Sequence, residues 1–126
     1  MFRCLAFALL ALAFSAPSLA QVQRNFPANA MRGTIVIDSP PQVTLNAQPA
    51  RLAPGARIFG QDNLLRLSGS LVGQKLLVHY TIDIQGLVKD VWILTATEAA
   101  KRPWPTTPQD LQTWQFDAVT QTWTRP

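Results

Sequence analysis

The sequence has one cysteine among 126 residues, and this residue, Cys4, precedes an apolar run near the N-terminus. The run, Leu5 to Phe14, is about ten residues long, whereas a helix that crosses a bilayer needs about 20. Arg3 supplies a positive charge before the run, and Ser18-Leu19-Ala20 provides the small-x-small pattern that a signal peptidase requires. Residues 1–20 are therefore expected to be a secretory signal peptide, which predicts a periplasmic protein.

The chain that would begin at Gln21 contains no thiol, which excludes disulfides, thiolate metal ligands and a cysteine nucleophile. A lipoprotein signal has its cysteine directly after the apolar run, where this chain has Ser15, so no lipid anchor is expected. No later apolar stretch has the length of a membrane span. About 106 residues suffice for one hydrophobic core. We expect one β-rich domain over residues 33–126, after a poorly ordered lead-in at residues 21–32.

Histidine is as scarce as cysteine, because His79 is the only one. A zinc site needs three or four ligands with His or Cys well represented. Asp83 lies four residues further along the same expected strand, about 13 Å away at 3.3 Å per residue, so it cannot orient His79 as a general base. No nucleophile elbow or phosphate loop occurs. We therefore predict no catalytic residue, no metal ligand and no cofactor, with His79 on the less buried face of its sheet.

The chain has seven acidic residues against eleven lysines and arginines, and the formal net charge is +4. The cations are scattered along the chain, and after residue 20 only Lys101 and Arg102 are adjacent. Nucleic-acid binding usually needs a basic stripe or cluster. We expect no nucleic-acid partner, and a partner, if there is one, among envelope proteins or glycans.

Short β-prone segments separated by turn residues make up the first half of the expected domain, from Gly33 to Gly69. Pro40-Pro41, Asn46 to Pro49 and Pro54-Gly55 separate these segments, because proline and glycine favour turn conformations. The pattern predicts a mainly β fold, an antiparallel meander in a small sandwich or barrel, with one or two short helices near the C-terminus.

The residues from Gln74 to Thr95 form two long β-prone runs around a turn, which predicts a hairpin. A type I turn that starts at Asp83 and has Gly86 in the left-handed position fits the turn preferences best. In this register Asp90 faces Tyr80. The residues expected on one buried face are Val78, Tyr80, Ile82, Val88, Trp92 and Leu94.

Two helix starts follow the hairpin. Thr95 to Glu98 has the pattern of a capping box, and Pro103 ends the helix that it begins. Thr107-Pro108 begins a second short helix that runs to about Trp114. Trp114 to Trp123 then forms a tight hairpin.

Tryptophan is in excess, and three of the four residues, Trp104, Trp114 and Trp123, lie in the last 23 positions. They form either a small accessory core or a possible partner surface, because tryptophan buries a large area and is also enriched at binding hot spots. Trp104 lies between Pro103 and Pro105, which lack backbone donors. On that ground we expect Trp104 to be exposed.

The amino-acid sequence of most of the mature chain resembles that of a group of small exported proteins of Gram-negative bacteria that have no assigned function. The resemblance implies no activity or site. The segments that carry it are Phe26–Ile37, Leu45–Gly60, Asp62–Leu65, Ser70–Thr81, Leu87–Thr95, Arg102–Pro108 and Gln121–Pro126.

The C-terminal half also resembles TonB C-terminal-like domains, in which a strand, a D-x-x-G turn, a second strand, a helix and a W-x-F ending follow one another. These correspond to Val78–Asp83, Gly86, Val88–Leu94, Asp110–Thr113 and Trp114–Phe116. The resemblance implies an adaptor that docks a strand of an envelope partner. The helix is shorter than in that family and prolines interrupt the middle, so the energy-coupling role is not transferred.

These observations favour a non-enzymatic periplasmic protein that acts by binding or structural association in the cell envelope. A TonB-like adaptor and a carboxylate-dependent enzyme are the alternatives.

Overall fold

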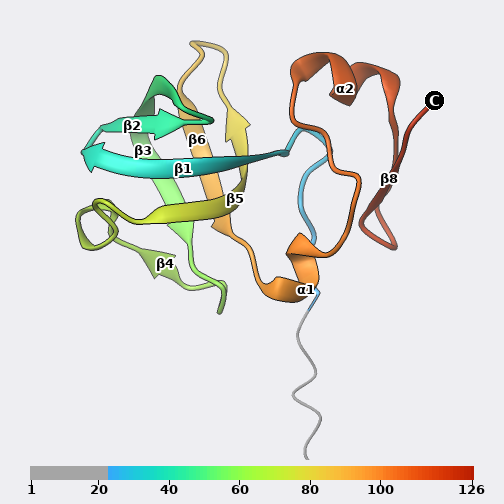
Figure 1. Cartoon of the computed structure of the whole chain (residues 1–126), viewed down its shortest axis with the longest axis horizontal. Helices are drawn as coiled ribbons and strands as arrows, with labels where there is room; N and C mark the ends of the chain where they lie inside the picture. The colour runs from blue at the N-terminus through green and yellow to red at the C-terminus, as the bar shows by residue number, and fades with distance from the viewer. Residues whose placement is uncertain (1–22) are drawn as a thin grey trace, which may run out of the picture.

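The computed structural model describes residues 23–126, so the predicted signal peptide lies outside the described residues (Figure 1). It is mainly β with two short helices near the C-terminus, which confirms the expected fold class. The elements are β1 (Met31–Ser39), β2 (Gln42–Leu45), β3 (Gln48–Phe59), β4 (Leu65–Arg66), a 3-10 turn η1 (Ser68–Ser70), β5 (Lys75–Ile82), β6 (Val88–Ile93), α1 (Ala96–Ala99), α2 (Pro108–Thr113), β7 (Gln115–Asp117) and β8 (Thr122–Thr124).

Five strands close into a small barrel. β1 pairs with β2 and with β5, β5 pairs with β6, β6 pairs with β3, and β3 pairs back with β2. The β3–β6 pair is parallel and the other four are antiparallel. β4 adds a short strand to the end of β3. A five-stranded Greek-key barrel is the architecture of the OB-fold, a fold that hosts unrelated functions and therefore assigns none by itself.

The barrel is filled by apolar side chains that alternate along its strands. Along β1, Met31, Gly33, Ile35 and Ile37 are buried, and the residues between them are partly exposed. Ile35 and Ile37 face Val78 and Val91 in this interior, which we call the barrel core. Period-two burial is what a strand requires when only one of its faces is fully covered, and the alternation in β1 therefore follows from its sequence.

A second core lies outside the barrel, between its wall and the C-terminal segments. Its buried members are Phe26, Ala30, Leu94, Trp104 and Trp123, and we call it the aromatic core. The segment before β1 runs among α1, α2 and β8 (Figure 1). This corrects the expectation of a poorly ordered lead-in, because residues 23–30 supply two of the five buried side chains. No local pattern indicates this burial, since the rings that Phe26 contacts, those of His79, Trp92 and Trp104, are 53 to 78 positions away in the chain.

The turn of the β5–β6 hairpin has the expected form, but the register of the strands differs beyond it. Gly86 has a φ of 79°, and its N–H donates to the carbonyl of Asp83 at 3.0 Å. Ile82 pairs with Val88 as expected, yet Tyr80 pairs with Val91 because one extra residue of β6 is accommodated opposite Thr81. This arrangement is a β-bulge, and it is stabilised by a hydrogen bond that the Thr81 hydroxyl accepts from the N–H of Asp90 at 3.2 Å.

Compared with the expected register, the bulge opposite Thr81 exchanges the two faces of β6. Val91 and Ile93 lie on the barrel side, whereas Trp92 and Leu94 face the aromatic core. The expectation that Trp92 and Leu94 share a face with Tyr80 is therefore wrong. Asp90 does not face Tyr80 either, because its carboxylate accepts a hydrogen bond from Arg57 at 3.2 Å.

The segments after β6 begin as the sequence predicts. The Thr95 hydroxyl accepts from the N–H of Glu98 at 3.2 Å, and the Glu98 carboxylate accepts from the N–H of Thr95 at 2.9 Å. This capping box starts α1. The Thr107 hydroxyl accepts from the N–H of Asp110 at 3.2 Å and caps α2, which has Pro108 in its first turn. β7 and β8 then pair as a hairpin that brings Phe116 opposite Trp123.

Candidate functional site

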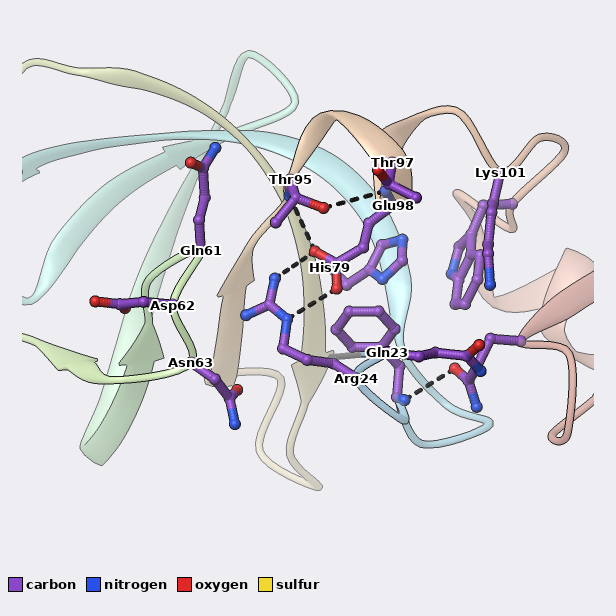
Figure 2. Close-up of a pocket in the computed structure, with 13 residues that line it drawn as sticks. Gln23, Arg24, Gln61, Asp62, Asn63, His79, Thr95, Thr97, Glu98 and Lys101 are labelled. Carbon is purple, nitrogen blue, oxygen red and sulfur yellow. Dashed lines mark hydrogen bonds and ion pairs between the residues drawn. The ribbon is translucent and has the colours of Figure 1, made fainter. Parts of the chain in front are cut away.

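A pocket of about 440 Å³ lies where the barrel, α1 and the C-terminal segments meet (Figure 2). Five segments that are distant in the sequence supply its walls. They are the chain around Arg24, the turn Gln61–Asn63, the outer face of β5 at His79, the start of α1 and the residues near Gln121. The pocket therefore exists only when the aromatic core is assembled.

His79 forms part of the pocket wall and is fully buried, at 0% exposure. Its ring stacks on Trp104, with centroids 4.0 Å apart and 22° between the planes. Phe26 meets the same ring in a T-shaped contact at 4.4 Å. His79 lies on the outer face of β5, as expected, but that face is not the less buried one, because the C-terminal segments cover it.

The tautomer of His79 follows from its neighbour. Nε2 lies 3.2 Å from Nε and 3.1 Å from Nη2 of Arg32. A guanidinium can only donate, so Nε2 accepts and the ring proton is on Nδ1. Burial, together with the charges of Arg32 and Arg24, lowers the pKa of His79 to about 2, so the ring is neutral at physiological pH. Nδ1 is buried and has no hydrogen-bond partner among the described residues.

Arg32 holds its position through neutral acceptors. Besides His79, it donates to the carbonyls of Glu98 at 2.9 Å, Ala99 at 3.2 Å and Lys101 at 3.0 Å. These carbonyls belong to α1 and the turn after it, where an orphan carbonyl favours a cation. Burial first and the charge of Arg102 second lower the pKa of Arg32 to about 10, which leaves it protonated at neutral pH.

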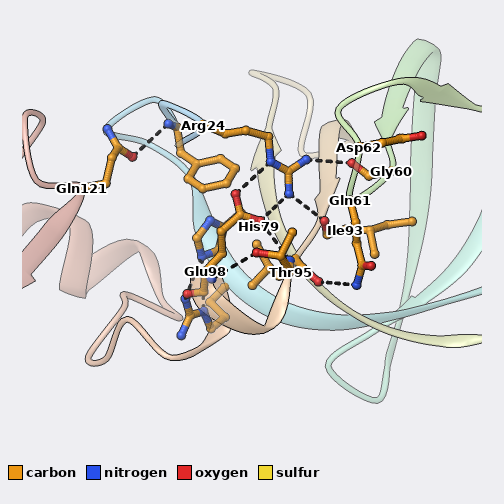
Figure 3. Close-up of polar contacts among 12 residues, drawn as sticks. Arg24, Gly60, Gln61, Asp62, His79, Ile93, Thr95, Glu98 and Gln121 are labelled. Atoms are coloured by element: carbon orange, nitrogen blue, oxygen red, sulfur yellow. Dashed lines mark hydrogen bonds and ion pairs between the residues drawn. The ribbon is translucent and has the colours of Figure 1, made fainter. Parts of the chain in front are cut away.

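A second arginine, Arg24, is buried beside the pocket and is paired with Glu98 (Figure 3). Its Nε donates to Oε2 of Glu98 at 2.8 Å, and its Nη2 donates to Oε1. Arg24 also donates to the carbonyls of Gly60 at 2.8 Å and Ile93 at 2.7 Å. This set of bonds ties the N-terminal segment to the barrel wall.

The carboxylate of Glu98 remains ionised in this setting. Burial alone would raise the pKa of Glu98, but the hydrogen bonds from Arg24 and from Thr95 outweigh it and hold the pKa below its usual value. A carboxylate that has an arginine partner and a backbone N–H partner has little capacity left to act as a general acid.

The rim of the pocket is polar and carries no net charge. Arg24 and Lys101 contribute two positive charges, and Asp62 and Glu98 contribute two negative ones. Asp62 is bonded to Arg66 outside the lining at 2.7 Å, and Lys101 donates to the carbonyl of Thr120 at 2.8 Å. The exposed side chains of Asn63 and Thr97 make no hydrogen bond within residues 23–126, so they can bond to a ligand.

The three tryptophans of the predicted partner surface do not form one. Trp104 is 5% exposed and Trp123 is 6% exposed, and both belong to the aromatic core. The expectation that Trp104 is exposed is wrong, because its indole N–H donates to the carbonyl of Ala30 at 3.0 Å inside that core. The missing donors of Pro103 and Pro105 do not prevent burial of the side chain between them. Trp114 is half-buried beneath Arg125, whose guanidinium carbon is 5.1 Å from the ring centre.

Sequence reasoning missed most of this site. The capping-box pattern located Glu98, but its second role as the partner of Arg24 depends on a residue 74 positions away. The sequence distinguishes His79 only as the single histidine, and no local pattern indicates that Arg32 fixes its tautomer. Within residues 23–126, no three His, Cys, Asp or Glu side chains gather closely enough to hold a metal ion. None of the described helices is long and apolar enough to span a bilayer.

No family model, curated protein or solved structure matches this chain. The two resemblances stated from the sequence therefore remain predictions. The function has to be argued from the geometry of the pocket itself.

Proposed function

We propose that this chain is an exported, non-catalytic binding protein whose pocket beside His79 takes a neutral, hydroxylated ligand of the glycan class. The observation that carries the proposal is the lining of the pocket, which combines an apolar wall at Phe26 and Trp104 with a polar rim whose charges sum to zero. The ring of His79 lies buried in that wall and can report on a ligand without contacting it.

The size and lining of the pocket support this ligand class. A volume of about 440 Å³ falls within the range of about 300–1,000 Å³ typical of small-molecule sites. Phe26 and Trp104 provide apolar wall, and the amides and hydroxyls of Asn63 and Thr97 provide donors and acceptors at the rim. Because the lining charges sum to zero, the pocket favours a neutral molecule over an ion.

The two alternatives receive less support. A strand-docking adaptor needs a free sheet edge of useful length. Within residues 23–126, the edge strand β4 has only two residues, and β7 and β8 of the separate two-stranded sheet have three each. An enzyme based on carboxylates needs one that is available for proton transfer or nucleophilic attack. The two carboxylates of this pocket, Glu98 and Asp62, are both engaged by arginines.

The binding proposal is tested by titrating the protein with neutral sugars, namely glucose, N-acetylglucosamine and a disaccharide of each. Binding is followed by ring ¹H–¹⁵N correlation of His79. We expect the Nδ1–H signal to shift on binding. Failure of every sugar to move it would contradict the proposal.

A matched pair of variants assigns the binding to the pocket. Asn63 has a φ of 64°, which glycine adopts readily, so Asn63→Gly removes the rim amide without backbone strain. Ala47 has the same φ of 64°, lies in the β2–β3 turn and does not line the pocket, so Ala47→Gly is the control. We expect Asn63→Gly to weaken sugar binding severalfold and Ala47→Gly to leave it unchanged.

Export is a separate part of the proposal and has its own test. If residues 1–20 are a signal peptide, mass spectrometry of the protein from a periplasmic extract will give a chain that begins at Gln21. A full-length chain confined to the cytoplasm would contradict export. That result would leave the pocket test untouched.

A further inference from the structure

A second pocket, of about 590 Å³, shares the wall formed by Trp104. Three arginines, Arg32, Arg102 and Arg125, line it together with Ala99 and the apolar side chains of Leu77 and Pro103. No Asp or Glu is part of this lining. Three cations without an anion distinguish this pocket from the one beside His79, where the charges balance.

The charge of Arg32 is not compensated by a bonded carboxylate. Its guanidinium donates to the ring of His79 and to three backbone carbonyls, all of them neutral. The nearby carboxylate of Glu98 is hydrogen-bonded to Arg24 instead. The positive potential of Arg32 therefore extends into the pocket that it lines.

The other two arginines keep their donors available. Within residues 23–126, neither Arg102 nor Arg125 makes a side-chain hydrogen bond or ion pair, and both are exposed. Arg125 lies over the ring of Trp114 at 5.1 Å, a cation–π contact that restricts its position without using its N–H groups.

We propose that Arg102 and Arg125 bind a phosphate group in this pocket, beside the partly buried charge of Arg32. A guanidinium presents its donors as a planar fork that fits two oxygens of a phosphate. Two such forks, with Arg32 behind them, match a doubly charged phosphate monoester better than a single carboxylate. The apolar wall at Leu77 and Pro103 suits an organic group attached to the phosphate.

The like-charge repulsion at this pocket supports the same ligand. Arg102 contributes to lowering the pKa of Arg32, so the two charges destabilise each other in the unliganded protein. A bound dianion would relieve that repulsion. The inference does not rest on the sugar-binding proposal, because it concerns a separate set of polar side chains.

The test is calorimetric titration of the protein with inorganic phosphate, with sodium chloride at matched ionic strength as the reference for general screening. The variant is Arg102→Gln/Arg125→Gln, which removes two exposed cations. Its control is Arg51→Gln/Lys89→Gln, which removes two other exposed cations that do not line the pocket and gives the same net charge. Circular dichroism confirms that each variant is folded.

We expect phosphate to bind the wild type and the control with equal affinity, and the double variant at least tenfold more weakly. Vesicles that contain phosphatidic acid, whose headgroup is a phosphate monoester, compared with vesicles of phosphatidylcholine alone, separate the two sources of phosphate. Binding that needs Arg102 and Arg125 assigns a lipid headgroup, and its absence assigns a free phosphate compound. Failure of phosphate to bind the wild type, equal binding by the double variant, or an equal effect of chloride would overturn the proposal.

Discussion

At the residue scale, His79 connects the two cores of the protein. It is on β5, whose opposite face fills the barrel, and its ring is enclosed by Phe26 and Trp104 of the aromatic core. Arg32 fixes its tautomer from the neighbouring strand, since Arg32 pairs with His79 across β1 and β5. The burial and the tautomer of this imidazole therefore depend on three separate parts of the chain.

The burial of His79 predicts a pH dependence of stability. The pKa is about 2 in the folded protein and about 6.5 in the unfolded chain. Below pH 6.5 the unfolded chain takes up a proton that the folded protein does not, so the free energy of unfolding falls as the pH falls. Between pH 6.5 and pH 5 we expect a loss of about 1–2 kcal/mol, measured by denaturant titration.

This pH interval isolates His79, because it is the only histidine and the carboxylates titrate lower. The control is His79→Gln, in which the loss between pH 6.5 and pH 5 should disappear even if the variant is less stable throughout. The same pH dependence in the variant would show that His79 is not held neutral.

Trp104 gives a second prediction at this scale. Trp104→Ala removes a buried ring that contacts His79, Phe116 and Trp123, so we expect a loss of about 3–5 kcal/mol in the free energy of unfolding. Val119→Ala is the control, because Val119 is 85% exposed and its truncation should change stability by less than about 0.5 kcal/mol. Similar unfolding midpoints for the two variants would mean that Trp104 is not part of a core.

At the scale of elements, the N-terminal segment and β6 show how distant parts of the chain determine local structure. Residues 23–30, directly before β1, have no regular secondary structure, yet Arg24 and Phe26 are buried. β6 contributes to both cores because its side chains alternate, and its bulge decides that Val91 enters the barrel and Trp92 faces outward. Phe26 and Trp92 both pack in the aromatic core, which the C-terminal segments complete.

The N-terminal segment should therefore contribute to stability. Phe26→Ala is expected to lower the free energy of unfolding by about 3–5 kcal/mol, because the ring contacts His79, Trp92 and Trp104. Asn25→Ala, at an exposed position next to it, should cost less than about 0.5 kcal/mol. Chemical denaturation measures both, and a negligible effect of Phe26→Ala would support the poorly ordered lead-in that the sequence suggested.

At the scale of the whole molecule, the barrel core and the aromatic core share β5 and β6 as a common wall. Both strands contribute side chains to each core, through Val78 and His79 on β5 and through Val91 and Trp92 on β6. A wall shared in this way couples the two cores, because loss of one exposes apolar surface of the other.

The shared wall predicts that the two cores unfold together. All four tryptophans pack in or against the aromatic core, whereas the single tyrosine, Tyr80, is in the barrel core. Thermal unfolding followed by tryptophan fluorescence and by tyrosine absorbance should therefore give one midpoint, as a two-state transition requires. An earlier tryptophan transition would show that the aromatic core melts on its own.

Local preferences of the amino-acid sequence account for several features of this protein. The β-rich fold class, the turn from Asp83 to Gly86 and the capping box from Thr95 to Glu98 all depend on residues a few positions apart, so local preferences predict them. The burial of alternate residues in β1 is of the same kind.

Which side chains contact one another depends on the tertiary structure. The bulge opposite Thr81 leaves the local β preference of β6 unchanged but exchanges its faces, so that Trp92 and Leu94 pack in the aromatic core. The Arg24–Glu98 pair and the unpartnered Nδ1 of His79 also need segments far apart in the chain. Burial and hydrogen bonding depend on distance in space, which the order of residues does not give until the chain is folded.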